Sequence, residues 1–428
     1  MTNATNGHTS TAERDIRDYS PIHGLKEYWY PAMEAKKVKN KPMGLDLLGV
    51  DLVLFRGKGG EVAALWNVCP HRGGSLMHGD CHFEGTVSCP YHGWTFDGDG
   101  NVLAVLPEGP ESKIPGKVKA RKYPTVTLKG MVWVWMGEGN PAPLEEDIPP
   151  EFFDDRSMMQ YATEYWPVNW LLAMDNGPDA HVPYVHRNAA RSYMFPVPAT
   201  GPVGLRNYVV NGRAIIARRS PNSRTPSKPF ARVYFPVLNG YWPKHNWRAL
   251  WTWMFLPLRR RAAKMHQWDT PEEWGGGHHL PAMFRSDHKT DLYTRFSVPV
   301  NETRSRQVYF KAVRPNSWLG RLYERTHFKL YGRWMQVTNF SMQDAGAIGQ
   351  QTYSVPEFLS ATDSHQVLWR RLLMQARGMM PPEEAQSVPE TTAELISFAR
   401  QEEQGLEPES ILSVGKESTR STPVESSL

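Results

Sequence analysis

Two short segments combine cysteine with histidine at spacings that suit a metal centre. They read CPHRGGSL at 69–76 and CPYHGW at 89–94. Each segment also contains glycine, which lets the chain turn tightly and aim backbone N–H groups inward. The whole chain holds only three cysteines, too few for a disulfide framework. The two segments therefore predict a site for iron–sulfur chemistry or for structural zinc.

The string CPHRGG…CPYHGW resembles the signature of Rieske [2Fe–2S] proteins at nearly every position, which favours iron over a Cys₂His₂ zinc site. In such a cluster the thiolates of Cys69 and Cys89 hold the ferric iron. The neutral imidazoles of His71 and His92 hold the other iron and raise the reduction potential relative to an all-cysteine cluster.

Respiratory-chain Rieske proteins carry an extra cysteine in each loop, joined as a disulfide, and here Gly74 and Tyr91 stand in those places. The difference favours the lower-potential oxygenase or ferredoxin branch. A Rieske ferredoxin needs only about a hundred residues, so the remaining two-thirds of the chain must have another role.

A second metal site is predicted in the segment 169–186 (NWLLAMDNGPDAHVPYVH). His181 and His186, with aspartates just upstream, fit the two-histidine, one-carboxylate set that binds O₂-activating Fe(II). On a regular helix the two histidines would point roughly 140° apart. Pro183 must break or kink a helix between them, which removes this objection.

The third ligand should be a carboxylate from another element. Asp344 lies at helical spacing on an apolar stripe that includes Val337 and Ile348. A carboxylate that faces a core is costly unless it is paired or binds metal. Asp344 is therefore the candidate, and Glu357 and Asp363, which lie near probable loops, are weaker ones.

The elements around these residues predict an α+β protein with a small all-β domain first. β-rich segments at Leu52–Phe55, Val62–Trp66 and Met131–Trp135, with the turn Asp97-Gly98-Asp99-Gly100, are typical of short antiparallel strands. We expect a mobile tail over 1–21, a Rieske domain over 22–145, a catalytic domain over 146–404 and a second mobile tail over 405–428.

The catalytic part mixes two periodicities. Arg248–Leu256, Leu292–Val298 and Gln307–Val313 are predicted strands, and Trp166–His186 and about 317–349 are predicted helices. Strands between long helices without a repeated βαβ unit favour an antiparallel sheet flanked by helices.

Composition excludes several function classes. No apolar stretch is long enough to cross a bilayer, and the polar start lacks a signal-peptide core, so we expect a cytoplasmic protein. A formal net charge of +5 without basic runs interleaved with aromatics gives no sign of nucleic-acid binding. No GxGxxG loop is present, so the chain carries no dinucleotide motif and its electrons must come from another protein.

With both motifs in place, the chain resembles the α subunit of the Rieske non-haem iron aromatic-ring-hydroxylating oxygenases over about 25 to 375. The resemblance implies a helix-grip catalytic domain and iron ligands at His181, His186 and Asp344. It also implies that Asp179 bridges the mononuclear iron to the Rieske histidine of a neighbouring subunit, with Asp175 in reserve. The spacing from Asp179 to His186 is one residue shorter than the common pattern and is more similar to the homotrimeric, α-only carbazole dioxygenase type.

The resemblance implies the terminal oxygenase of a multicomponent system. Such a protein takes electrons from a separate NAD(P)H-dependent reductase or ferredoxin and uses O₂ at Fe(II) to hydroxylate an aromatic compound. Oxidative O- or N-demethylation of a methylated aromatic is the alternative reaction. A Rieske electron carrier without catalytic iron is the alternative from another class, and the set His181, His186 and Asp344 argues against it.

Overall fold

The computed structural model describes residues 21–177, 185–186, 189, 205–219, 268–287, 291–351, 357–359 and 363–379. The predicted tails, apart from residue 21, and the predicted strand Arg248–Leu256 lie outside these described residues. The predicted domain boundaries therefore stay a prediction.

The first part of the chain folds into three small antiparallel sheets, with strand orders β1-β10-β9, β2-β3-β4-β8 and β5-β6-β7. The strands are β1 Trp29–Glu34, β2 Met43–Leu47, β3 Val50–Arg56, β4 Val62–Trp66, β5 Thr86–Ser88, β6 Trp94–Asp97, β7 Val102–Val105, β8 Lys122–Tyr123, β9 Thr125–Leu128 and β10 Met131–Trp135. Single 3₁₀ turns occur at Ala35–Lys37, Leu76–His78 and Gly109–Glu111. The all-β fold expected for this region is confirmed.

The three strands predicted here all form, as β3, β4 and β10. The predicted hairpin turn joins β6 to β7, where the Asp97 carboxylate accepts hydrogen bonds from the backbone N–H groups of Asp99 and Asn101. Gly100 adopts a φ of +78°, which glycine reaches without a steric penalty.

The second part is built on one seven-stranded antiparallel sheet of order β11-β17-β16-β15-β14-β13-β12. Its strands are β11 Met158–Trp166, β12 Leu205–Val210, β13 Ala214–Arg219, β14 Gly277–His279, β15 Met283–Asp287, β16 Leu292–Asn301 and β17 Arg304–Val313. The predicted strands Leu292–Val298 and Gln307–Val313 fall within β16 and β17, so the expected antiparallel sheet is confirmed.

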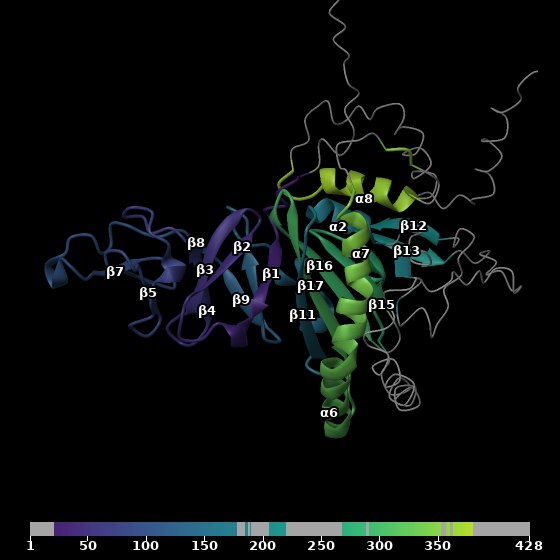
Figure 1. The fold of residues 1–428 in the computed structure, drawn as a ribbon, viewed down its shortest axis with the longest axis horizontal. Helices are drawn as coiled ribbons and strands as arrows, with labels where there is room; N and C mark the ends of the chain where they lie inside the picture. The colour runs from purple at the N-terminus through teal and green to yellow at the C-terminus, as the bar shows by residue number, and fades with distance from the viewer. Residues whose placement is uncertain are drawn as a thin grey trace, which may run out of the picture.

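The described part of the chain has five α-helices. They are α1 Leu144–Asp147, α2 Trp170–Asp175, α6 Trp318–His327, α7 Met342–Ile348 and α8 Ser364–Met374, with 3₁₀ turns at Pro150–Phe152 and Glu272–Trp274. Figure 1 shows α6 and α7 running along the sheet and α8 lying across its end, close to α2.

The single helix predicted over Trp166–His186 is wrong. Trp166 ends strand β11, and α2 covers only residues 170–175 before the chain leaves helical geometry at Asn176. Asn169 caps its start by accepting a hydrogen bond from the Leu171 N–H. Gly177 and Pro178 follow the helix end, a pair that does not continue a helix.

The second predicted helix, over about 317–349, forms as one helical segment with an irregular centre. Residues 328–332 and 334–341 are π-helical between α6 and α7. The wider π turn changes which residues share a face. Within α7, Asp344, Ala345 and Ile348 are buried, whereas Ala347 is exposed.

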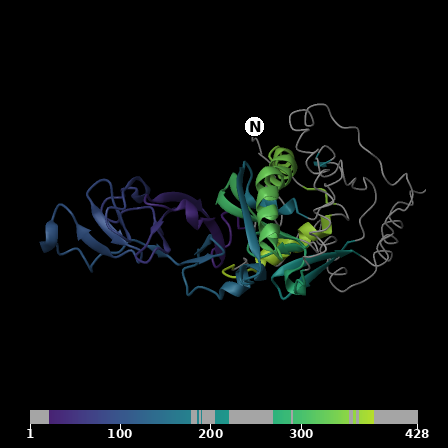
Figure 2. The ribbon, with the colours of Figure 1, turned by 90° about the horizontal axis from the view of Figure 1, so that it is seen from below.

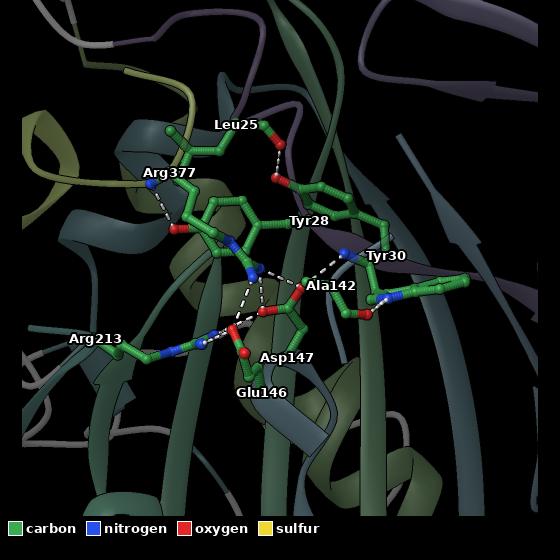
Figure 3. Close-up of polar contacts among 9 residues, drawn as sticks. Leu25, Tyr28, Tyr30, Ala142, Glu146, Asp147, Arg213 and Arg377 are labelled. Atoms are coloured by element: carbon green, nitrogen blue, oxygen red, sulfur yellow. Dashed lines mark hydrogen bonds and ion pairs between the residues drawn. The ribbon is translucent and has the colours of Figure 1, made fainter. Parts of the chain in front are cut away.

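A buried charge cluster joins the two parts of the chain (Figure 3). Asp147, at the end of α1, is fully buried and receives hydrogen bonds from Arg213, Arg377 and the backbone N–H of Trp29. Burial raises the pKa of the Asp147 carboxyl, and the charges of Arg377 and Arg213 oppose that rise. The cluster ties strand β1 to residues from the second part.

The molecule is elongated. Figures 1 and 2 place the small sheets at one end of the long axis and the seven-stranded sheet with its helices towards the other. Strand β5 lies far out at the small-sheet end, away from α7. None of the helices in the described part of the chain is long and apolar enough to span a membrane.

Candidate metal centres

The two cysteine–histidine loops have the same backbone design. In the first, the Cys69 N–H donates to the Gly74 carbonyl and the Gly73 N–H donates to the Cys69 carbonyl. In the second, Cys89 forms the equivalent pair of hydrogen bonds with Trp94 and Gly93. Two equal turns side by side are what a cluster held by two loops requires.

Glycine is needed in each loop for a local reason. Gly73 and Gly93 adopt φ values of +76° and +64°, a region that L-residues with a Cβ rarely enter. Gly74 is required by space, because a Cβ at this position would lie 3.0 Å from the Cys89 sulfur. Gly73 and Gly93 therefore serve the conformation of their own loops, and Gly74 serves the close contact between the two loops.

The two thiols are buried beneath the loops. Cys69 and Cys89 are 1% and 4% exposed, and both belong to the apolar core of the small-sheet region. Burial, together with the neighbouring Cys89 thiol, raises the pKa of Cys69 to about 11. Without metal this thiol keeps its proton at neutral pH, and iron binding must release it.

The two imidazoles lie at the surface end of the loops. His71 and His92 have ring centroids 4.6 Å apart, and His71 stacks on Trp94. Slight desolvation, and then the charges of His71 and Arg72, lower the pKa of His92. This shift favours the neutral imidazole that binds metal. Thiols inside and imidazoles outside fit the donor set of a Rieske cluster.

In the second part of the chain, His186 lies against Asp344. The His186 Nε2 atom is 2.9 Å from Asp344 Oδ1, and both side chains are buried, at 0% and 4% exposure. Asp344 comes from the start of α7 and His186 from the segment that follows α2. The structure thus brings together two of the three residues predicted to bind the mononuclear iron. His181 and Asp179 lie outside the described residues.

Gln343 orients the His186 ring. Its Nε2 donates to the Asn339 carbonyl at 2.8 Å, so the atom that faces His186 Nδ1, at 3.4 Å, is the Gln343 carbonyl oxygen. An acceptor opposite Nδ1 favours the tautomer with the proton on Nδ1 and a lone pair on Nε2. That lone pair and the Asp344 carboxylate then face each other, which fits a cation between them.

Asp175 and Glu357 lie elsewhere. Both contact the buried Arg370 of α8, at 2.5 Å from Asp175 and 2.6 Å from Glu357. Asp175 was the reserve candidate for the inter-subunit bridge, and Glu357 was a weaker candidate for the third iron ligand. The two carboxylates thus bind the same guanidinium group. Asp363 precedes α8 as its cap residue.

No three His, Cys, Asp or Glu side chains converge on a single ion site within the described residues. A Rieske cluster takes only two protein ligands on each iron, and one ligand predicted for the mononuclear iron, His181, falls outside the described ranges.

Sequence reasoning missed the residues that support the ligands. Phe340 stacks on the His186 ring at 3.6 Å between centroids, and Gln343 orients the same ring. In the sequence, the only sign of this role was that both residues lie close to Asp344 on the same predicted helix. The buried Arg295 and Arg370 gave none, because an arginine in a strand or helix is usually solvated.

Two family models match consecutive stretches of the chain. Residues 28–124 match the Rieske [2Fe–2S] domain. Residues 135–205 match the family described as homotrimeric ring hydroxylase. The second match includes α2 and the predicted ligands His181 and His186.

Curated relatives cover part of the chain. The terminal oxygenase component of carbazole 1,9a-dioxygenase from a Sphingomonas species is 34% identical over 186 residues, which are 42% of this chain and 49% of that protein. The oxygenase component of dicamba O-demethylase from Stenotrophomonas maltophilia is 33% identical over 175 residues, covering 40% of this chain and 50% of that protein. The matches therefore span about half the length of these relatives.

Solved structures extend the likeness in fold to most of the chain. The reduced complex between oxygenase and ferredoxin in carbazole 1,9a-dioxygenase superposes with a TM-score of 0.63 at 22% identity, covering 86% of this chain and 94% of that one. An identity this low supports the fold alone. The two family models thus give this chain a Rieske [2Fe–2S] domain followed directly by a ring-hydroxylase segment, and its curated relatives are oxygenase components.

Proposed function

We propose that this protein is the terminal oxygenase of a multicomponent system that hydroxylates an aromatic compound with O₂. The observation that carries the proposal is the buried pair of His186 and Asp344, 2.9 Å apart, in a chain that also has a Rieske domain. An electron carrier has no use for a second buried metal-binding pair. We place the protein in the cytoplasm.

The ligand assignment is part of this proposal. Cys69, Cys89, His71 and His92 would hold the [2Fe–2S] cluster, and His181, His186 and Asp344 would hold the mononuclear iron. When bound, that iron would supply the O₂-activating chemistry of a two-histidine, one-carboxylate site with open positions. The chain itself contributes burial of His186 and Asp344, ring orientation by Gln343, and the stacking of Phe340 on the His186 ring.

Electron supply is the second part. The imidazole end of the cluster loops is the exposed end, which suits electron entry from a ferredoxin or reductase. The complex of a similar oxygenase with ferredoxin supports such a donor. We propose a homotrimer in which Asp179 links the cluster of one subunit to the iron of the next, because β5 and α7 lie far apart within one chain (Figure 1). The engagement of Asp175 by Arg370 favours Asp179 for this role.

Oxidative demethylation of a methylated aromatic is the second candidate reaction. It is favoured by the similarity to dicamba O-demethylase, which matches over a share of the chain comparable to that of the carbazole enzyme. Both reactions use the same metal centres, so product analysis decides between them. Formaldehyde release from a methoxylated aromatic would identify demethylation, and a hydroxylated ring without formaldehyde would identify ring hydroxylation.

The first test is the iron and acid-labile sulfide content of protein purified without air. We expect about three Fe and two sulfides per chain, from one cluster and one mononuclear ion. About two Fe and two sulfides, unchanged after addition of Fe(II), would contradict the oxygenase proposal and favour an electron carrier. Loaded protein should then consume O₂ with an aromatic substrate, a reductase and NAD(P)H.

A further inference from the structure

The C-terminal end of α2 is held by buried side chains from the surrounding sheet and helix. This end leads directly into the segment 178–186, which carries the predicted iron ligands. The last carbonyl groups of any helix lack partners within it and need donors from elsewhere. Here the carbonyls of Ala173, Asp175 and Asn176 face such donors.

Arg295 of β16 supplies the central contact. Its Nη2 atom donates to the Ala173 carbonyl at 2.7 Å and lies 3.4 Å from the Asn176 carbonyl. The guanidinium group is 3% exposed and lies over the rings of Trp166 and Phe284. The helix dipole favours a cation at a helix C-terminus. Burying the charge of Arg295 at this place costs free energy of desolvation.

Helix α8 holds the same turn from another side. Gln366 Nε2 donates to the Asp175 carbonyl at 3.1 Å, and the neighbouring Arg370 binds the Asp175 carboxylate. Both side chains are buried. The backbone and the side chain of Asp175 are therefore fixed by one helix.

A chain of buried histidines reaches the turn from β14. Asn207 contacts His365 Nδ1 at 2.8 Å, and His365 Nε2 contacts His278 Nδ1 at 2.9 Å. The backbone at Gly177 passes directly against the His278 ring, since a Cβ on Gly177 would lie only 2.1 Å from His278 Nε2. Only glycine allows this approach, so the ring fixes the path of the chain as it leaves α2.

The turn lies close to the pair formed by His186 and Asp344. Ala173 of α2 packs in one buried apolar cluster with Ala345 and Ile348 of α7, the helix that carries Asp344. The Arg295 contact and the predicted ligand on α7 therefore border one buried region.

We propose that Arg295, Gln366 and His278 are positioning residues for the mononuclear iron, because they fix the α2 end from which the histidine ligands emerge. The proposal rests on the proposed function. Side chains that orient metal ligands typically change metal affinity by 10- to 100-fold when they are removed.

Fe(II) affinity of the second site tests the proposal without relying on turnover. The dissociation constant for one Fe(II) per chain would be measured anaerobically on protein with an intact cluster, for Arg295→Met, Arg295→Lys and Gln366→Leu. The matched control is Arg306→Met, because Arg306 is equally buried on the adjacent strand β17 and also binds two backbone carbonyls, those of Pro31 and Ala32. Cluster absorption would report the integrity of the Rieske domain.

We expect Fe(II) binding at least about tenfold weaker in Arg295→Met and Gln366→Leu, partly restored in Arg295→Lys, and unchanged in Arg306→Met. Wild-type affinity in Gln366→Leu and Arg295→Met would overturn the proposal, and so would an equal loss in Arg306→Met. If Arg295→Met does not fold, Gln366→Leu decides alone. A wild-type protein that binds no second iron would instead overturn the proposed function, so the two failures are distinguishable.

Discussion

At the scale of single residues, Gly74 limits how the two cysteine loops can approach each other. A methyl group at this position would lie 3.0 Å from the Cys89 sulfur, inside ordinary contact distance. Overpacking of this kind typically costs about 1–3 kcal/mol, and here the strain falls on a predicted cluster ligand. We therefore expect Gly74→Ala to lower acid-labile sulfide per chain while leaving Fe(II) binding at the second site intact.

The control for this substitution is Gly139→Ala. The nearest atom to a Cβ at Gly139 lies at 3.9 Å and belongs to a flexible glutamate, so sulfide content should match that of the wild type. A full complement of sulfide and normal visible absorption in Gly74→Ala would contradict the close packing of the loops.

Asp344 and Glu357 offer a direct test of the third iron ligand. Asp344 contacts His186, whereas Glu357 contacts Arg370. Replacing a carboxylate ligand by its amide keeps the shape and removes the charge that binds metal. We expect Asp344→Asn to lose the mononuclear iron and to retain the two Fe and two sulfides of the cluster. We expect Glu357→Gln to retain all three iron ions. Iron analysis checks both, and the reverse pattern would exclude Asp344 as the ligand.

At the scale of elements, three buried histidines, two on β14 and one on α8, link folding to pH. Burial lowers the pKa of His365 to about 3, and burial followed by the Arg285 charge lowers that of His279 to about 3. Burial also lowers the pKa of His278 well below its usual value. In the unfolded chain each titrates near about 6.5, so between these values the unfolded state binds more protons than the folded state.

Their stabilising contribution is fully present above pH of about 6.5 and declines as the pH falls, by about 1.4 kcal/mol per pH unit for each histidine. We expect the urea concentration at half-unfolding to drop steadily between pH 7 and 5. His365→Gln should reduce the slope of this midpoint against pH by about a third, because it removes one of the three histidines. The control His23→Gln changes an exposed histidine and should leave the slope unchanged. A midpoint independent of pH in this range would contradict the burial of neutral histidines.

The elements also show what sequence patterns can predict. Runs of β-rich residues predicted β3, β4, β10, β16 and β17, and these strands are buried along most of their length. The helix over Trp166–His186 was wrong since its apolar residues belong first to a strand and then to the short α2. The π-helical centre of the segment 328–341 escaped prediction because no residue type marks it.

The candidate site was predictable to the extent that local spacing encodes it. The Cys–His loops follow from their motif, and Asp344 from its position on an apolar stripe. The contacts of Arg295 with Ala173, and of Arg370 with Asp175, join residues more than a hundred positions apart. Such long-range contacts depend on how sheet and helices pack, which periodicity does not specify.

At the scale of the whole molecule, the cluster loops and α7 lie towards opposite ends of an elongated chain (Figures 1 and 2). Electron transfer between the two centres is therefore expected to cross from one subunit to the next in a head-to-tail trimer. If so, a subunit without a functional cluster still works when its neighbour supplies electrons. Two inactive chains should then complement each other.

This can be tested by co-expressing Cys89→Ser, which is expected to lack the cluster, with Asp344→Asn, which is expected to lack the catalytic iron. With equal amounts and random assembly, roughly a quarter of the interfaces pair an intact cluster with an intact iron site across the boundary. Each doubly tagged mixed trimer has one such interface out of three, so these trimers should recover about a third of wild-type turnover, whereas each variant alone stays inactive. Since neither chain holds both centres, recovered activity requires transfer between subunits, and inactive mixed trimers with both metals loaded would mean that electrons travel within one chain.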